Sequence, residues 1–378
     1  MITYYKKIKK ILFAKKIFSK PKECKVLIYD RQGSHNIKKF FKKNLYQILD
    51  TRFESVYIVI LIKSLIKYNF RWKPFFYLIE LIKKINPSFI ITWTDNDSNF
   101  YKLKKFYKKN IKTAFIQNGT RSVKLDIFEK LKKKDKTSFA VDLMFVFNHS
   151  IGRLYSSFIQ GEFIPIGSLR NNFYKKKKIK RKKDVMFISQ YLSKNELPIS
   201  YKAYNKILDL NKMTYECLKE FCEKNNLTVK ILTKNNFDGN PTLYNQEIDF
   251  YKNIDNKVKI IHKNNKTNVY KLTDSFKIVA TNYSTLGYES FSRGNRTAFF
   301  SFSNFGKDHK FGWPANYKKT GPFWTSSIEK KKIFKILKFL FTISDSEWHK
   351  LYSKYSNKLM SYDYGNKIFR DKITNLII

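Results

Sequence analysis

Short apolar runs alternate with helical stretches along most of the chain, and this alternation limits the possible folds more than any other feature. In the first half, runs rich in β-branched and aromatic residues cover 25–29, 55–60, 89–93, 113–116, 143–147 and 163–166. Between them lie helical patterns such as FFYLIELIKKI at 75–85, and another at 100–109. Apolar runs of this length, separated by helices, are typical of parallel strands that are buried on both faces. The sequence therefore predicts a doubly wound α/β domain.

The same pattern restarts after a strongly basic segment, KKKKIKRKK, in which eight of nine residues are Lys or Arg. We interpret this segment as a solvated linker, with a membrane-binding patch as the alternative. Beyond it, strands are expected at 185–189, 228–232, 258–261, 276–281 and 297–302, and a long helix at 210–225. We therefore expect two Rossmann-like domains facing a cleft. The expected divisions are a basic amphipathic segment, a first domain, the linker, a second domain and C-terminal helices, at 1–23, 24–174, 175–183, 184–343 and 344–378.

The net charge of +46 raises the possibility of a nucleic-acid partner. The basic residues are 66 lysines and only 10 arginines, whereas specific phosphate and base recognition favours the planar fork of Arg. Lys, Ile, Asn, Phe and Tyr are enriched together, as a low-GC coding bias would produce. We therefore expect no specific nucleic-acid partner, although a basic surface still attracts polyanions and acidic lipid head groups.

The first twenty residues form a basic amphipathic segment, with lysines on one helical face and apolar residues roughly on the other: Tyr4, Ile8, Ile11, Leu12 and Phe18. Lysines interrupt every apolar stretch, so we do not expect a signal peptide. Two interpretations stay open: a helix lying in an anionic membrane surface, or an ordinary helix packed on its domain.

The longest apolar run, at 56–62, is far shorter than the roughly 20 residues of a membrane span. Three cysteines without a regular spacing favour a reducing compartment.

The segment IVATNYSTLGYESFSRGNRTAFFS indicates a strand, a polar turn, a helix that starts near Ser284, and a second strand. Ser284 and Thr285 would place hydroxyls and free backbone N–H groups at the helix start, where a phosphate or diphosphate can bind. Gly287 would allow a ligand or a backbone segment to approach the first turn, and Glu289 could accept hydrogen bonds from ribose hydroxyls. The alternative is an ordinary helix cap with Glu289 facing solvent.

Polar residues also follow three of the strands predicted in the first domain. Asp95 comes after FIITW, and a carboxylate there could act as a general base toward an acceptor hydroxyl, or simply cap the next helix. Asn118 and Arg121 come after TAFI, where Asn could bind hydroxyls and Arg could neutralise a sugar carboxylate or a leaving phosphate. A turn with a surface Arg is the alternative for this second pair. Asp30, after the first strand, could contact the same acceptor or belong to a plain turn.

The stretch STLGYESFSRG resembles the C-domain motif of bacterial surface-carbohydrate (O-antigen) biosynthesis proteins, which look like GT-B glycosyltransferases. The proteins of this family also resemble Kdo-type capsule transferases and glycerophosphotransferases. TWTDN, IQNGTR, PIGSLRNN, FISQ and FGWPANYKKTGPFW resemble the same family in the same order along the chain. One departure is Asn118-Gly119, where related transferases often have His-Gly, which puts in doubt any mechanism that needs a histidine there.

The resemblance implies a glycosyltransferase-like enzyme of surface polysaccharide or O-antigen biosynthesis. It would transfer a sugar from a nucleotide-activated donor to a glycan or lipid-linked acceptor, with the nucleotide sugar as co-substrate and no other cofactor. The first domain would present the acceptor to Asp95, Asn118 and Arg121. The second would hold the nucleotide sugar through Ser189, Ser284, Thr285, Gly287, Glu289 and Arg293.

The resemblance also implies a metal-independent reaction. Asp95 and Asp97 have the D-x-D spacing of GT-A metal sites, but a chain of two Rossmann-like halves does not match that fold. We expect a cytoplasmic location, peripheral at the inner face of the plasma membrane. The alternatives are a glycerol- or sugar-phosphate transferase of the same fold, a basic nucleic-acid-binding protein, or a non-catalytic scaffold of the glycan machinery.

Overall fold

The computed structural model divides the chain into two compact units, Met1–Arg170 with Asn366–Ile378, and Asn171–Gly365. It describes residues 2–107, 111–122, 126–132, 135–176, 184–194, 201–301, 310–327 and 329–377, without the side chains of 2–7, 70, 201–203 and 377. The division differs from the expected one, because the last residues return to the first unit instead of forming a separate group of helices. Of the expected linker, 177–183 lies outside the described residues.

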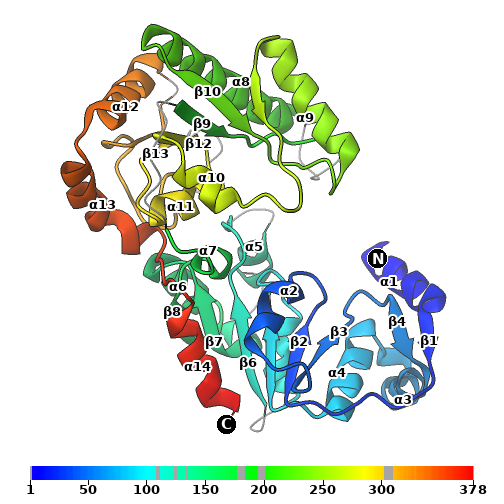
Figure 1. The fold of residues 1–378 in the computed structure, drawn as a ribbon. Coiled ribbons are helices and arrows are strands. Elements are labelled where there is room, and N and C mark those ends of the chain that lie inside the picture. Colours follow the sequence, from blue (N-terminus) through cyan, green and yellow to red (C-terminus); the bar gives the residue numbers. More distant parts are fainter. Residues whose placement is uncertain are drawn as a thin grey trace. The chain divides into compact units, whose positions relative to one another are not determined.

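Six parallel strands form the sheet of the first unit, in the order β3-β2-β5-β6-β7-β8 (Figure 1). Their bounds are Tyr46–Leu49, Val26–Tyr29, Phe89–Thr92, Lys112–Ile116, Ala140–Val146 and Gln160–Pro165. All four residues of β2 and of β5 are buried, as expected of central parallel strands. Five of the six strands coincide with apolar runs in the sequence. The interrupted pattern YQIL of β3 was not predicted.

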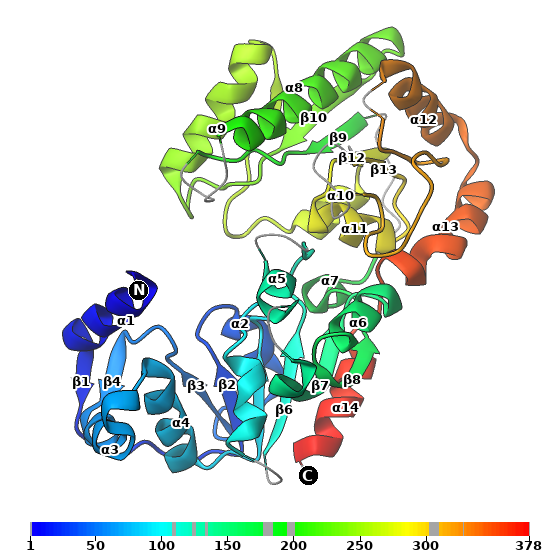
Figure 2. The same cartoon turned by 180° about the vertical axis from the view of Figure 1, so that it is seen from behind.

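The helices of this unit include α2 (Ser34–Ile37), α4 (Pro74–Ile85), α5 (Ile127–Lys132), α6 (His149–Ser156) and α14 (Lys367–Ile377). The short helix α7 (Leu169–Asn172) contains the point at which the chain passes from the first unit to the second. The stretch predicted as a helix at 100–109 forms a 3-10 helix over Phe100–Lys105. α14 lies beside β7 and β8 in both views, and Phe369 packs against Phe145 with ring centroids 4.7 Å apart (Figures 1 and 2). This packing ties the C-terminal helix to the first unit.

The edge of the first unit contains α1 (Ile2–Phe13) and a pair of short parallel strands, β1 (Lys15–Ile17) and β4 (Ser55–Tyr57), followed by α3 (Ile58–Tyr68). The prediction of a strand over 55–60 is therefore wrong beyond residue 57, where α3 begins. A short run of β-branched residues fits a strand and a buried helix equally well, and here the helix also receives a tertiary contact from Trp72.

The second unit also has a six-stranded parallel sheet, in the order β11-β10-β9-β12-β13-β14. Its strands are Lys259–Ile261, Thr228–Leu232, Asp184–Ile188, Ile278–Thr281, Thr297–Phe300 and Trp324–Thr325. Its helices are α8 (Tyr201–Lys224), α9 (Pro241–Ile254), α10 (Val269–Asp274), α11 (Thr285–Ser292), α12 (Lys330–Thr342) and α13 (Asp345–Leu359). Counted in chain order, these strands follow 3-2-1-4-5-6, the Rossmann order.

Each sheet has one point at which the order of strand addition reverses. In the first sheet it lies between β2 and β5, and in the second between β9 and β12. Ligands of open parallel sheets bind outside the carboxyl ends of the strands at such a point. The segments after β2 and β5, and after β9 and β12, are therefore the places where this fold favours a ligand. They contain Asp30, Asp95, Ser189 and Ser284.

Candidate functional site

Asp95 follows β5 and is fully buried. Nε of Arg121 donates to its Oδ2 over 2.8 Å, and Nη2 of Arg121 donates to its Oδ1. The hydroxyl of Tyr155, on α6, donates to the same Oδ2 over 2.7 Å, and the backbone N–H of Asn118 lies 3.4 Å from Oδ1. Both carboxylate oxygens are thus occupied by donors from the protein.

Asn118 and Arg121 complete a network with Asp95, so the structure brings together the three residues expected to face the acceptor. Nδ2 of Asn118 donates to the carbonyl of Trp93 over 2.8 Å, and its Oδ1 accepts from Nη2 of Arg121. Burial alone would lower the pKa of Arg121, but the neighbouring carboxylate of Asp95 outweighs it and raises that pKa. A paired and fully buried carboxylate favours a role for Asp95 in positioning Arg121. The general-base role stays a prediction that this geometry does not favour.

A cavity of about 430 Å³ lies at the carboxyl ends of β2, β3 and β5, at the switch point of the first sheet. Polar groups in its wall come from the segments after these strands and from α1: Lys10, Asp30, Thr51, Arg52, Thr94, Asn96, Asp97 and Asn99. Phe53, Phe75 and Leu78 provide an apolar side. Hydroxyl-bearing rings bind in sites of this mixed character, where polar groups fix orientation and apolar groups cover a face.

Asp30 supplies one of the two carboxylates in the wall of this cavity, and its backbone has an unusual conformation, with φ of 106°. Its Oδ1 accepts from the backbone N–H of Gln32 over 3.0 Å, and its Oδ2 from the hydroxyl of Thr94 over 3.3 Å. Nη2 of Arg52 lies 3.6 Å from Oδ2. A positive φ is costly for a residue with a side chain and persists where the surrounding structure requires it, often at a functional site.

Tyr29 also lines the cavity, and its buried hydroxyl has no hydrogen-bond partner among the described residues. Burial raises the pKa of Tyr29 far above its ordinary value, and the carboxylates of Asp97 and Asp30 raise it further. The hydroxyl therefore remains protonated. A buried donor without an acceptor costs free energy.

In the second unit, Ser189 follows β9 and is fully buried. Its Oγ accepts from the backbone N–H of Tyr191 over 3.1 Å and from the hydroxyl of Tyr251 over 3.0 Å. Glu247, on α9, is hydrogen-bonded to the same serine, and burial raises the pKa of its carboxyl group. The buried hydroxyl of Ser189 therefore holds the segment after β9 in place through these hydrogen bonds.

Ser284 is the N-cap of α11, and the helix occupies Thr285–Ser292 as predicted. Oγ of Ser284 accepts from the backbone N–H of Leu286 over 3.3 Å, and Thr281 fixes the turn by accepting from the N–H of Ser284 over 3.2 Å. Both Ser284 and Thr285 are half-buried, so the helix start reaches the surface of its unit. Gly287 packs on the strand, because a Cβ there would lie 2.3 Å from Cγ2 of Thr281.

Glu289 and Arg293 lie in the interior of the second unit. Oε1 of Glu289 accepts from the hydroxyl of Tyr270 over 3.3 Å. Nε of Arg293 donates to Asp274 over 2.9 Å, and its Nη1 donates to the carbonyl of Tyr174 over 2.7 Å. Arg293 thus holds the chain that enters the second unit, while its expected contact with the donor stays a prediction.

Several partners of these residues were missed in the sequence: Arg52, Tyr155, Glu247 and Asp274. None lies in a recognisable motif, and each reaches its partner only through the tertiary fold. Within the described residues, no three side chains of His, Cys, Asp or Glu gather as a metal ion would require. The expectation of metal-independent chemistry stays a prediction.

Comparison with known proteins finds a matching family and solved structures with a similar fold. A family model described as "putative O-antigen biosynthesis protein" matches residues 114–377. No curated protein matches the sequence. Among solved structures, the wall teichoic acid polymerase TagF is similar with a TM-score of 0.51 and 13% identity, over 93% of this chain and 88% of its own.

Two epimerase-type structures are similar to the same extent. MnaA of S. aureus, in a co-structure with UDP, has a TM-score of 0.52 and 12% identity over 94% of this chain and 96% of its own. The UDP-GlcNAc 2-epimerase of Neisseria meningitidis, bound to UDP-GlcNAc, has a TM-score of 0.52 and 12% identity over 93% and 99%. These likenesses confirm the GT-B fold that the sequence predicted.

Proposed function

This chain belongs to the O-antigen biosynthesis family, and we propose that it is a glycosyltransferase of surface polysaccharide assembly. It would move a sugar from a nucleotide-activated donor to a glycan or lipid-linked acceptor on the cytoplasmic side of the membrane. The observation that carries the proposal is the placement of polar side chains at the switch points of two parallel sheets. The nucleotide and nucleotide sugar in two structures of the same fold support a nucleotide-sugar donor.

We place the donor diphosphate at the start of α11, beside Ser284 and Thr285. The helix dipole favours an anion at this end of α11, where both residues lie at the surface of their unit. As the bond between the anomeric carbon and the phosphate oxygen breaks, the electron pair stays on the leaving diphosphate, and the positive end of the helix would stabilise it. Ser189, Gly287, Glu289 and Arg293 would act indirectly, since they hold β9, α11 and the entering chain in place.

We place the acceptor in the cavity of the first unit, with Asp30 as the general base. Its carboxylate lines the cavity, whereas Asp95 does not line it and is held in a two-pronged ion pair with Arg121. Asp30 would take the proton of the acceptor hydroxyl as that oxygen bonds to the anomeric carbon. Asp95 would be a positioning residue that keeps Arg121 and Asn118 in place. The cationic groups of Lys10 and Arg52 suit an acceptor that also carries a phosphate or a carboxylate.

A transfer assay with purified protein tests the proposal. The protein is incubated with a panel of nucleotide sugars and lipid-linked glycan acceptors, and mass spectrometry follows the acceptor. We expect the mass to rise by one sugar residue. Transfer of a sugar phosphate or a glycerol phosphate would instead identify the alternative reaction at phosphorus, and no product with any donor would contradict both.

Variants of Asp30 separate the chemistry from the fold. Asn tolerates a positive φ, so Asp30→Asn should fold normally and lower turnover by about 10² to 10⁴. Asp371→Asn, which removes an exposed carboxylate from α14 of the same unit, is the matched control and should leave turnover unchanged. Wild-type turnover in Asp30→Asn would remove Asp30 from the mechanism.

A further inference from the structure

The helix α3 exposes its apolar side chains and buries a polar one. Only Ile60 and Ser64 are buried in its eleven residues. Ser64 is fully buried, where its Oγ donates to the carbonyl of Leu61 over 2.8 Å and accepts from Nε1 of Trp72 over 2.9 Å. Ile66 is 76% exposed. A surface helix of a water-soluble domain normally has the opposite arrangement.

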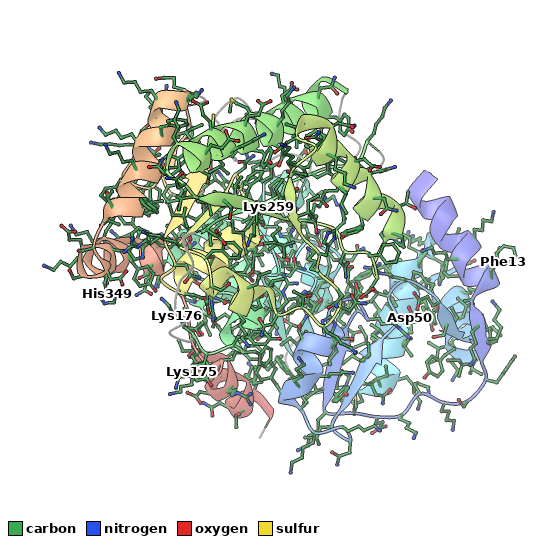
Figure 3. All side chains as sticks on the ribbon, turned by 45° about the horizontal axis from the view of Figure 1, so that its top comes forward. Phe13, Asp50, Lys175, Lys176, Lys259 and His349 are labelled. Carbon is green, nitrogen blue, oxygen red and sulfur yellow. The ribbon has the colours of Figure 1, made fainter. Side chains whose placement is uncertain are left out.

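Other exposed apolar side chains come from the elements next to α3. Phe18 directly follows β1, whose last residue pairs with Tyr57, the residue before α3. Phe13 is 80% exposed at the end of α1, where Figure 3 shows it pointing away from the helix. Figures 1 and 2 both show α1, β1, β4 and α3 together at one edge of the first unit. We call this group the apolar edge: Leu12, Phe13, Phe18, Val59, Ile62, Leu65 and Ile66.

The apolar edge gathers most of the large apolar side chains that are exposed among the described residues. Seven of the thirteen large apolar side chains exposed in the described part of the chain belong to it. Single exposed apolar residues need no explanation, but a concentration of them on neighbouring elements marks an interaction surface.

The positive charge around the apolar edge indicates which kind of partner fits this surface. The first 22 residues contain eight lysines and no Asp or Glu. Among them, Lys9, Lys10 and Lys15 are exposed, and α3 adds the exposed Lys63. A second copy of this chain would bring lysines against lysines across the interface. A partner that is apolar inside and anionic at its surface avoids this repulsion, and an anionic lipid bilayer has both properties.

We propose that the apolar edge inserts into the surface of an anionic membrane, with α3 lying in the interface and the lysines on lipid head groups. No helix in the described ranges is long and apolar enough to cross a membrane, so the attachment would be peripheral. The biological purpose of this attachment rests on the proposed function, because a lipid-linked acceptor is reached from the membrane surface. Membrane binding itself needs neither donor nor acceptor.

Vesicle sedimentation with the full chain tests this surface. The probes are vesicles of phosphatidylcholine with and without phosphatidylglycerol. We expect binding to the anionic vesicles that weakens as salt is raised, and little binding to phosphatidylcholine alone. Ile62→Ser with Ile66→Ser should weaken binding about tenfold or more, because two side chains no longer enter the acyl region.

The control carries the same kind of change elsewhere on the surface. Phe237→Ser with Ile368→Ser also removes two exposed apolar side chains and should bind vesicles like the wild type. Circular dichroism checks that both double variants are folded. Wild-type vesicle binding by the α3 variant, or no binding of the wild type to anionic vesicles, would overturn the proposal. So would a wild-type dimer in vesicle-free solution that the α3 variant converts to monomer, because the surface would then join two copies.

Failure of this inference and failure of the proposed function give different results. If the protein transfers sugar to a detergent-solubilised acceptor but does not bind vesicles, only the proposed membrane surface is wrong. If the protein binds anionic vesicles through α3 but makes no product, only the proposed transfer reaction is wrong.

Discussion

Arg121 lies against the buried carboxylate of Asp95 in a two-pronged ion pair, with Nε 2.8 Å from Oδ2. The pair joins the ends of neighbouring strands β5 and β6, and Tyr155 adds a hydroxyl from α6. It therefore fixes three separate segments of the first unit near the proposed acceptor cavity.

Removing the charge of Asp95 should destabilise the first unit. Breaking one partner of a buried ion pair leaves the other charge without compensation and costs about 3–5 kcal/mol. We therefore expect Asp95→Asn to lower the free energy of unfolding by about that amount, measured by denaturant titration. Tyr155→Phe keeps the ion pair and loses one hydrogen bond, so its cost should be only about 1 kcal/mol. An Asp95→Asn protein as stable as the wild type would contradict the positioning role.

Adding one methyl group at Gly287 should disturb the start of α11. Its Cβ would lie 2.3 Å from Cγ2 of Thr281, so Gly287→Ala forces the helix away from β12 at a cost of about 1–3 kcal/mol. Thr281→Ser removes that methyl group and keeps the hydroxyl that binds the N–H of Ser284. In a double-mutant cycle, the pair should be more stable than the sum of the two changes predicts. Strict additivity would show that the contact does not limit the helix position.

Asp142 should give the first unit a pH-dependent stability. Burial alone would raise the pKa of Asp142, but hydrogen bonds from Lys104 and from the N–H of Thr113 outweigh it and lower that pKa below its ordinary 3.8. A lowered pKa contributes stability that is present above the ordinary value and is lost as the pH falls through the folded-state pKa.

Asp142→Asn should therefore lower the free energy of unfolding at pH 7, by about 1–3 kcal/mol for charged hydrogen bonds. The difference from the wild type should shrink when denaturant titrations are repeated well below the ordinary pKa of 3.8. Asp371→Asn, at an exposed position, should show no such pH dependence. A difference that stays constant over this range would mean that the charge of Asp142 does not stabilise the fold.

The sequence was most informative where a strand is buried on both faces. β2, β5, β6 and β7 each overlap a short apolar run, as is typical of parallel strands that are buried on both faces. The edge strand β3 was missed because Gln47 interrupts its pattern and only Leu49 of its four residues is buried. The start of α3 was mistaken for part of a strand, because Ile58, Val59 and Ile60 continue the apolar run of β4 with no polar residue to mark a helical period.

From the sequence, one can predict only that residues following adjacent strands lie close together. Asp95 and Asn118 follow adjacent strands, so their proximity could be expected from the sequence. The occupation of both oxygens of Asp95 could not, because Tyr155 comes from a helix 60 residues further along the chain. In the same way, the burial of Arg293 depends on Asp274, which no motif marks.

We propose that the second unit binds a nucleotide-activated sugar, and a thermal-shift titration of the purified protein tests this binding. A ligand that binds only the folded state stabilises it by about 2.7 kcal/mol at a hundredfold excess over its Kd. We expect at least one nucleotide sugar to raise Tm by several degrees in a saturable manner, while a single-stranded oligonucleotide at the same salt does not. A Tm that no nucleotide or nucleotide sugar changes, but that the oligonucleotide raises, would contradict it.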